Sequence, residues 1–426
     1  MNDVQLIAFH LPQFHPIPEN DAWWGKGFTE WTNVVRAQPN FDGHYQPHLP
    51  ADLGFYDLRL DAARAEQAAL AARYGITGFC FHYYWFNGKR LLEQPLEAML
   101  AGGAPDHPFC LCWANENWTR RWNGDERNIL IAQEHSPEDD LAMINDVARY
   151  FADPRYIRFN GRPVLLVYRI DILPDPAAMV RRWRDACRAL GVGDPYLCAV
   201  QSFGIGDPTV HGFDAAVEFP PHGMIAAELA DSQTGKPADF GGRIFSYADA
   251  ARFALAKPAV AYPRFRCVMP SWDNTARRLR YGHCYYGSHP VLYRAWLAAL
   301  IDQARQDQHL PVPAVFINAW NEWGEGCHLE PDLRYGHAWL QATQAALQQG
   351  EAPAEFTQAM LAGAQPQGDA PADAPWAAFS FTAAPKQLLA NGLRSRAYLR
   401  LRYVVNKNQR LKRALMPVAR LLGWLE

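Results

Sequence analysis

Two glutamates, Glu322 and Glu325, stand three residues apart directly after the apolar run Ala314–Trp320. The run predicts a buried strand, and an i, i+3 spacing places both carboxyl groups on one side of the following turn. Two carboxyl groups that close together do not both ionise easily, so one keeps a proton near neutral pH. An acid beside a carboxylate suits catalysis at the anomeric carbon of a sugar. The alternative is a structural helix N-terminus, where the helix dipole favours acidic residues.

The elements that must position this pair are short apolar runs that alternate with helix-like stretches. The runs are Gln5–His10, Gly78–Tyr84, Phe109–Trp113, Val164–Arg169, Tyr196–Ser202, Ala215–Phe219, Phe265–Pro270 and Ala314–Trp320. Continuous apolar runs are typical of parallel strands that are buried on both faces. Eight strand–helix units predict an α/β fold, a closed (β/α)₈ TIM barrel with long βα loops. An open doubly wound sheet is the alternative, but no Gly-x-Gly-x-x-Gly motif follows any run.

The helices between the runs carry start and stop signals. Ser136-Pro137 and Asp175-Pro176 each offer a capping side chain before a proline that suits the first helical position. The stretch Asp57–Tyr74 has amphipathic spacing and ends at a glycine. Further helices are expected over Ser288–Asp307 and Tyr335–Gln349.

Polar and aromatic side chains gather where the expected strands end, which is where TIM barrels place their active sites. Buried polar groups are costly without partners, so their concentration there indicates a binding site. Amide side chains suit vicinal diols, and aromatic rings suit sugar faces. Alternation along a strand lets at most half of a consecutive run face the barrel centre. The expected substrate-binding residues are His10, Gln13, His82, Tyr83, Tyr84, Trp113, Asn115, Glu116, Asn117, Tyr168, Gln201, Glu218, His222, Trp272, Asn318, Trp320 and Asn321.

Each of these residues also has a structural alternative. Glu116 could form an ion pair with Arg120 or Arg121, and Glu218 could belong to a buried ion pair. The asparagines could hold loops, and the histidines could be hydrogen-bonded core residues. The adjacent Trp23 and Trp24 suggest a platform over the site or a small hydrophobic cluster that pins their loop.

Composition excludes some classes of function and partner. The net charge of −3 gives no indication of nucleic-acid binding. The chain has no His-Glu-x-x-His motif, and no second cysteine pair matches Cys110 and Cys112, so we expect no metal and no other cofactor. The eight cysteines lie mostly in apolar runs and are expected to be reduced core thiols. The first residues lack signal-peptide features and no run is long enough to span a bilayer, so a cytoplasmic location is expected.

The composition changes near residue 350, which predicts three segments. Residues 1–350 form the barrel, and 351–385 form a linker rich in alanine and proline. Residues 386–426 carry ten basic side chains against one acid and have apolar residues at helical spacing. This pattern indicates a basic amphipathic tail for an anionic membrane surface or an acidic partner. The alternative is a C-terminal helix packed on the barrel.

Several of these motifs resemble the WbsX-like protein family. The matching segments are HLPQFHP at 10–16, WWGKGFTEWTNV at 23–34, GHYQPH at 43–48, HYYWF at 82–86, CWANENW at 112–118 and NEWGEG at 321–326. The resemblance covers about residues 4–346 and leaves the tail outside. It implies a glycosyltransferase of bacterial surface polysaccharide assembly, such as O-antigen or lipopolysaccharide.

The expected barrel is also similar to glycoside hydrolase family 99, the endo-α-mannosidases. That resemblance implies that a Glu-Trp-x-Glu pair does the chemistry, with Glu325 as the general acid/base. Glu322 would help the sugar's own 2-hydroxyl attack the anomeric carbon, which gives a 1,2-anhydro intermediate and net retention. Gly324 stands where these hydrolases often carry a larger residue, which leaves the pocket shape and the substrate open.

These observations predict a retaining carbohydrate-active enzyme whose partner is an oligosaccharide or a lipid-linked glycan. Glycosyl transfer is the first hypothesis and endo-acting hydrolysis of the α-mannosidase type is the second. The absence of an Asp-x-Asp motif of metal-dependent nucleotide-sugar transferases weighs against transfer. A non-catalytic glycan-binding protein, or a scaffold tethered by its tail, are the alternatives from other classes.

Overall fold

The computed structural model describes residues 3–120, 125–349, 365–367 and 380–382. Within these residues, eight parallel strands form a closed barrel in the order β1, β14, β12, β10, β9, β8, β4 and β2, and the pairing of β1 with β2 closes it. The strands are β1 (Gln5–His10), β2 (Gly78–Phe86), β4 (Phe109–Trp113), β8 (Arg162–Val167), β9 (Tyr196–Gln201), β10 (Ala215–Glu218), β12 (Arg264–Val268) and β14 (Ala314–Ile317). The predicted TIM barrel is therefore confirmed, with a strand at each of the eight apolar runs.

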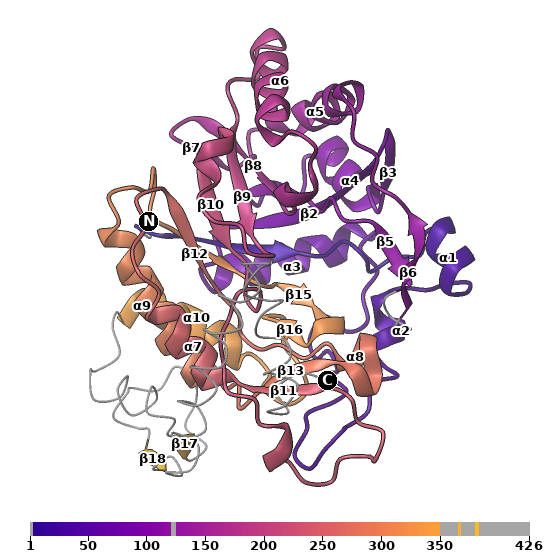
Figure 1. Ribbon diagram of the computed structural model, residues 1–426, viewed down its shortest axis with the longest axis vertical. Coiled ribbons are helices and arrows are strands. Elements are labelled where there is room, and N and C mark those ends of the chain that lie inside the picture. Colours follow the sequence, from indigo (N-terminus) through magenta and orange to yellow (C-terminus); the bar gives the residue numbers. More distant parts are fainter. Residues whose placement is uncertain (1–2, 121–124, 350–364, 368–379, 383–426) are drawn as a thin grey trace, which may run out of the picture.

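Helices cover the outside of the barrel, and α9 and α10 lie side by side (Figure 1). They are α3 (Asp61–Arg73), α4 (Gln94–Gly102), α5 (Pro137–Phe151), α6 (Pro176–Ala189), α7 (Tyr247–Leu255), α9 (Pro290–Gln306) and α10 (Ala338–Gln349). The predicted capping signals are confirmed. Ser136 accepts a hydrogen bond from the backbone N–H of Asp139, and Asp175 accepts one from Ala178.

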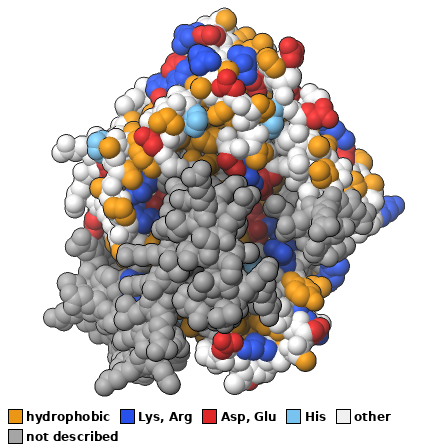
Figure 2. Space-filling model, in the orientation of Figure 1, with side chains coloured by type: hydrophobic (Ala, Val, Ile, Leu, Met, Phe, Trp, Pro, Cys, Tyr) orange, Lys and Arg blue, Asp and Glu red, His pale blue; other side chains and the backbone are white. Residues whose placement is uncertain are grey.

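The core explains why the strands are continuous apolar runs. All nine residues of β2 and all five of β4 are buried, since the barrel interior lies on one side and the helices on the other. Trp183 of α6 packs against Trp113 of β4 on the helix side, with ring centroids 5.8 Å apart. The eight cysteines are free and buried. Charged side chains of both signs cover α5 and α6 at the top of the molecule (Figure 2).

Short elements in the βα loops shape one end of the barrel. After β14 the chain forms a hairpin of β15 (Asn321–Glu322), η6 (Trp323–Glu325) and β16 (Cys327–His328). The loop after β1 carries α1 (Pro18–Trp24) and α2 (Glu30–Val34), and the loop after β12 carries α8 (Thr275–Arg278) and η5 (Leu279–Tyr281). β11 (Arg243–Ser246) pairs in parallel with β13 (His283–Tyr286), outside the barrel sheet.

The remaining short elements do not belong to the eight strands that close the barrel. They are β3 (Lys89–Leu91), β5 (Trp118–Arg120), β6 (Asp125–Ile131), β7 (Arg158–Phe159), η2 (Ile170–Ile172), η3 (Pro208–His211) and η4 (Ala230–Ser232). Within the segment expected to be a linker, β17 (Gln365–Gln367) pairs with β18 (Ser380–Thr382). The rest of the segment 351–385 and the whole of 386–426 lie outside the described residues. Among the helices that are described, none has the length and hydrophobicity needed to cross a bilayer.

Candidate active site

The two predicted acids share one arginine. Arg277 of α8 donates from Nη2 to Glu322 Oε2 at 2.8 Å and from Nη1 to Glu325 Oε1 at 2.7 Å. Its Nε donates to Glu30 Oε1 of α2 at 2.9 Å. Glu322 caps the 3₁₀ turn η6 and Glu325 is its last residue. Residues three apart are eclipsed in such a turn, so both side chains point to the same side. The loops after β1, β12 and β14 thus meet at one guanidinium.

Burial of this cluster favours a proton on the pair. Three carboxylates around one guanidinium would carry a net charge of −2 if all were ionised. Burial raises the pKa of Glu325 to about 8, although Arg277 opposes the shift, while the charges of Glu322 and Glu30 add to it. Burial also raises the pKa of Glu322 against the effect of Arg277. This shift favours a proton on Glu325 near neutral pH.

The pair opens into a cavity of about 680 Å³ at the carboxyl ends of the strands. Both acids line this cavity, and the side chain of Glu325 is 21% exposed against 9% for that of Glu322. Eight of the expected substrate-binding residues line it too. These are Gln13, His82, Tyr84, Glu116, Asn117, Tyr168, His222 and Trp272.

Contacts between the lining residues fix several of them. His82 Nε2 lies 3.9 Å from Glu322 Oε1, and the Tyr168 hydroxyl lies 3.1 Å from His222 Nε2. Glu116 forms an ion pair at 2.5 Å with Arg169. Trp24 lines the cavity, whereas Trp23 packs edge-on against Trp118 at 5.8 Å. Their contact with a sugar stays a prediction.

Four expected residues are aromatic or histidine side chains that the structure places away from the cavity. His10 lies 3.2 Å from Gln67 Oε1 on the helix side of β1, and Trp113 packs against α6. The Tyr83 hydroxyl donates to Asp146 at 2.6 Å, because alternation along β2 turns it away from His82 and Tyr84. Trp320 is fully buried.

Asn115 and Asn321 each hold a neighbouring backbone instead of lining the cavity. Asn321 accepts from the Leu11 N–H at 2.7 Å and donates to the Leu11 carbonyl at 3.0 Å. Asn115 does the same with Arg169, at 2.8 Å in both directions. In both cases the side-chain amide forms a pair of hydrogen bonds with one backbone residue, as a neighbouring strand would. These bonds connect one loop to the next.

Asn318, Gln201 and Glu218 also have structural partners. Asn318 donates to the Pro220 carbonyl at 2.7 Å, and Gln201 donates to the Tyr262 hydroxyl at 3.0 Å. Glu218 accepts from Lys257 and Arg266, at 3.0 Å each. Burial alone would raise the pKa of Glu218, but these cations hold it below its ordinary value, so it is a charged structural residue.

The residues that hold the pair, and one wall of the cavity, were not predicted from the sequence. Glu30 lies inside the motif at 23–34, but nothing in its spacing connects it to Arg277. The wall comes from β11 and β13, where Arg243 faces His283 and Phe245 faces Tyr285 in register. The last two rings stack at 5.2 Å. Side chains that line the cavity alternate along both strands, which could have indicated two strands. The alternation does not indicate that these two strands pair.

Gly324 is required by the close approach of Glu30. A Cβ built on Gly324 would lie 1.8 Å from Glu30 Oε1 and 2.9 Å from Arg277 Nε. We expect Gly324→Ala to lower the free energy of unfolding by about 1–3 kcal/mol, because the crowded side chains must shift. Chemical denaturation measures this loss. Gly206→Ala is the control, since its Cβ would meet no atom within 4 Å and should change stability little. Equal effects of the two substitutions would contradict the steric account.

The raised pKa of Glu325 predicts a pH-dependent effect of its replacement on stability. Above its ordinary pKa of 4.5 the unfolded chain loses this proton, whereas the folded protein keeps it until about pH 8. The stability that the group contributes is complete below pH 4.5 and is lost as the pH rises toward 8. Glutamine cannot ionise. As the pH rises, the free energy of unfolding of Glu325→Gln should therefore increase relative to that of the wild type, by at most about 1.4 kcal/mol per pH unit.

Denaturation of both proteins between about pH 5 and 8 tests this expectation. Glu97→Gln is the matched control. Hydrogen bonds from Arg149, Tyr150 and Arg90 outweigh burial and lower the pKa of Glu97 to about 2. The effect of Glu97→Gln on the free energy of unfolding should therefore stay nearly constant over that pH range. A Glu325→Gln difference that does not change with pH would contradict the assignment of the proton.

Residues 6–343 match the family described as "Glycosyltransferase WbsX". The chain belongs to this family. The match confirms the resemblance seen in the sequence motifs, and it includes the barrel, the Glu322–Glu325 hairpin and Arg277. Membership of the WbsX family points to a carbohydrate-active enzyme.

Two relatives from Xanthomonas campestris pv. campestris carry the name WxcX and are described as uncharacterized proteins. The relative from strain B100 is 52% identical over 342 residues, which is 80% of this chain and 49% of that protein. The relative from strain ATCC 33913 is 51% identical over the same shares. This WbsX family member therefore spans about half the length of the curated relatives it matches.

Solved structures share the fold at low sequence identity. A "glycoside hydrolase-like protein" aligns with a TM-score of 0.53 and 14% identity over 83% of this chain and 95% of that chain. The GH99 endo-alpha-mannosidase from Bacteroides thetaiotaomicron aligns with a TM-score of 0.52 and 15% identity over 82% and 98%. These similarities establish the barrel of this WbsX family member and leave its substrate open.

Proposed function

We propose that the protein is a retaining carbohydrate-active enzyme of bacterial surface polysaccharide biosynthesis, of the O-antigen or lipopolysaccharide type, that transfers a glycosyl group. The observation that carries the proposal is the buried pair Glu322 and Glu325, held by Arg277 at the floor of a cavity with aromatic walls. Its volume of about 680 Å³ falls within the range of pockets that enclose small ligands. Membership of the WbsX family supports a glycosyl group as the ligand.

The two acids have different roles in the proposed reaction. Glu322, the less exposed of the two, takes the proton of the sugar 2-hydroxyl, and that oxygen attacks the anomeric carbon. The bond to the leaving oxygen breaks as Glu325 donates its proton to it. The acceptor hydroxyl then gives its proton to the Glu325 carboxylate and opens the 1,2-anhydro ring, while Glu322 returns its proton to the 2-oxygen. Two inversions at the anomeric carbon give net retention.

Arg277 supports these roles by its position. It contacts both carboxyl groups, so its positive charge is available to whichever of them is ionised at a given step. Burial raises the pKa of both acids and Arg277 opposes both shifts, so a proton on one of them lowers the cost of ionising the other. Proton exchange within such a pair needs little rearrangement.

The cavity walls supply groups that suit a sugar. Tyr84, Tyr168 and Trp272 offer rings, and His82 lies within reach of both a sugar hydroxyl and Glu322. The stacked rings of Phe245 and Tyr285 form a platform in the wall that β11 and β13 supply. Aromatic faces with a few convergent polar groups are typical of sites that orient an amphipathic ligand.

Hydrolysis is the second candidate, because the barrel shares the fold of the GH99 endo-alpha-mannosidase. Hydrolysis and transfer differ in whether water or a sugar hydroxyl attacks the anomeric carbon. The deciding experiment incubates the protein with purified oligosaccharides and nucleotide sugars in H₂¹⁸O. A lengthened product without ¹⁸O supports transfer, and a shortened product with one ¹⁸O shows hydrolysis. Binding without any new product would contradict both and leave a glycan-binding protein.

A lipid-linked glycan, a cytoplasmic location and membrane contact through 386–426 remain proposals. Deletion of residues 386–426 tests whether the barrel is the enzyme. Turnover of soluble oligosaccharides should survive the deletion if the cavity does the chemistry. Loss of that turnover, with the barrel still folded by circular dichroism, would instead favour a scaffold that depends on its tail.

A further inference from the structure

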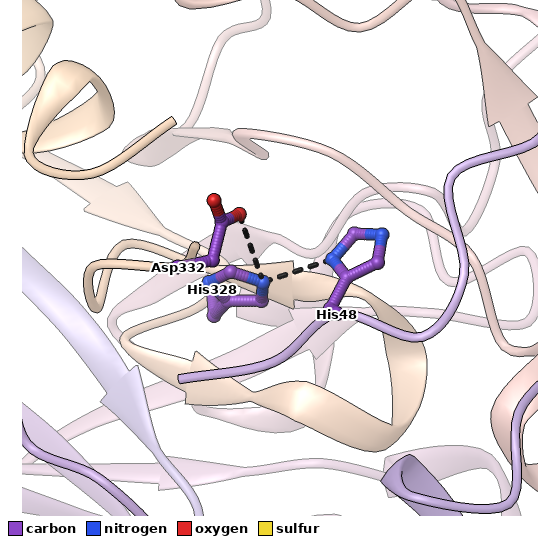
Figure 3. A group of neighbouring side chains, drawn as sticks. All are labelled: His48, His328 and Asp332. Carbon is purple, nitrogen blue, oxygen red and sulfur yellow. Dashed lines mark hydrogen bonds and ion pairs between the residues drawn. The ribbon is translucent and has the colours of Figure 1, made fainter. Parts of the chain in front are cut away.

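Three ligand-type side chains meet in the protein interior outside the catalytic cavity. His48, His328 and Asp332 are 7%, 1% and 1% exposed, and their ligand atoms all lie within 4.8 Å of one another (Figure 3). His48 Nδ1 lies 2.9 Å from His328 Nε2, and Asp332 Oδ2 lies 3.8 Å from the same nitrogen. Figure 3 shows that the imidazole of His48 and the carboxyl group of Asp332 both point toward this nitrogen.

The hydrogen bond that His328 makes outside the group of three leaves the lone pair of its other ring nitrogen directed into the group. His328 Nδ1 lies 2.9 Å from the Glu330 carbonyl, which can only accept, so Nδ1 carries the proton and Nε2 is bare. An outer hydrogen bond of this kind is typical of histidines that bind metals, because it fixes the tautomer. The 2.9 Å contact between His48 Nδ1 and His328 Nε2 requires one of the two nitrogens to be an acceptor, and the bond to the Glu330 carbonyl makes that nitrogen His328 Nε2.

Asp332 presents an oxygen without a hydrogen-bond partner. Its Oδ1 accepts from the backbone N–H groups of Arg334 and Tyr335, at 2.9 and 2.6 Å. Its Oδ2 is buried and makes no hydrogen bond among the described residues. The nearby Tyr45 hydroxyl, which is buried like Oδ2, makes no hydrogen bond of good geometry with it. A buried carboxylate oxygen without a partner is costly, and a bound cation would remove that cost.

We propose that His48 Nδ1, His328 Nε2 and Asp332 Oδ2 bind one divalent transition-metal ion of the zinc class. Two imidazoles and a carboxylate form a common zinc ligand set, with bonds of about 2.0–2.2 Å. In tetrahedral geometry such bonds place ligand atoms roughly 3.3 Å apart, and the observed 2.9 and 3.8 Å lie on either side of that spacing. The ion displaces the proton between the two rings to His48 Nε2, so both imidazoles stay neutral.

The proposed ion has room for a further ligand. His48 and Asp332 also line a second cavity of about 230 Å³, which shares Trp272 and Tyr285 with the catalytic cavity and would let water reach a fourth position on the ion. Metal dependence was not expected from the sequence, because the ligands are 280 and four residues apart and match no metal motif.

The ion would hold the hairpin of Glu322 and Glu325 in place and would take no part in the reaction itself. The His328 ring stacks on Trp323 with centroids 3.7 Å apart, and Trp323 stands between Glu322 and Glu325 in the hairpin. His48 belongs to the loop between β1 and β2, so the ion would fasten that loop to the hairpin. We expect bound metal to raise the melting temperature.

Metal titration of the chelator-stripped full-length protein tests the proposal without an activity assay. We expect one Zn²⁺ per chain by calorimetry and one Co²⁺ per chain with the visible absorption of a low-symmetry site that includes histidine nitrogens. Asp332→Asn keeps an acceptor for Arg334 and Tyr335 and removes the charge, so it should fold and bind at least about tenfold more weakly.

His289→Asn is the matched control, because His289 lines the same cavity but lies outside the group of three. Its hydrogen bond to the Val291 N–H can be kept by an asparagine oxygen, and its metal binding should equal that of the wild type. Failure of the wild type to bind one metal per chain would overturn the proposal. So would equal affinity in Asp332→Asn, or an equal loss in both variants. If Asp332→Asn does not fold, X-ray absorption of the wild type must still show two histidine ligands.

Discussion

Glu322→Gln is expected to lower the turnover rate by about 10²-fold or more while substrate binding is kept. Glutamine has nearly the shape of glutamate and can still accept the hydrogen bond that Arg277 donates to Glu322 Oε2 at 2.8 Å. It cannot take the proton of a sugar 2-hydroxyl, so only the transition state loses an interaction. Steady-state kinetics and calorimetric binding on the first accepted substrate measure the two effects separately.

The control for this substitution is Glu134→Gln, an exposed glutamate that accepts a hydrogen bond from Asn87 at 3.0 Å. It should leave both rate and affinity unchanged. A glycan-binding protein without catalysis predicts that Glu322→Gln leaves binding and biological output intact. Turnover by Glu322→Gln within a few-fold of the wild type would contradict the assigned role of Glu322.

Arg277→Met is expected to cost about 3–5 kcal/mol of unfolding free energy, because it leaves three carboxyl groups without their shared cation. The loss should be larger at high pH than at low pH, since protonation of Glu322 and Glu325 relieves the uncompensated charge. Denaturation curves at two pH values measure this dependence. Activity should fall too, because the two acids lose the group that holds them together.

A double variant separates the electrostatic account from simple loss of packing. Arg277→Met combined with Glu325→Gln removes one of the unpaired acids, so it should be destabilised less than the sum of the single effects. Arg155→Met is the matched control. It breaks a buried ion pair with Asp153, and neither residue lines the cavity, so stability should fall with little effect on turnover of the folded protein. Additive effects in the double variant would contradict the account of the charge cluster.

The barrel could be predicted from the sequence because its signals are local. Each strand is a short apolar run, and helices such as Pro137–Phe151 begin at a capping serine followed by proline. The predicted ends of the strands were less accurate than their positions in the chain. The last strand stops at Ile317, three residues before the expected Trp320, because Asn321 pairs with Leu11 and starts a separate hairpin.

The candidate site was only partly predictable, for a physical reason. Glu322 and Glu325 are neighbours in the chain, so their spacing was visible, whereas Arg277 reaches them only because the strands before α8 and the hairpin are adjacent in the barrel. Position at a strand end also does not say where a side chain points. Tyr84 lines the cavity and Tyr83 lies on the opposite side, while Asn115 and Asn321 hold backbone.

The most direct test measures product formation and binding by Glu325→Gln on a substrate that the wild type converts. Glu325 is the acid with the pKa near 8, and glutamine copies its protonated shape without a proton to give. We expect binding close to that of the wild type and turnover reduced by about 10²-fold or more. Product formed by Glu325→Gln at the wild-type rate would show that the reaction does not use this pair.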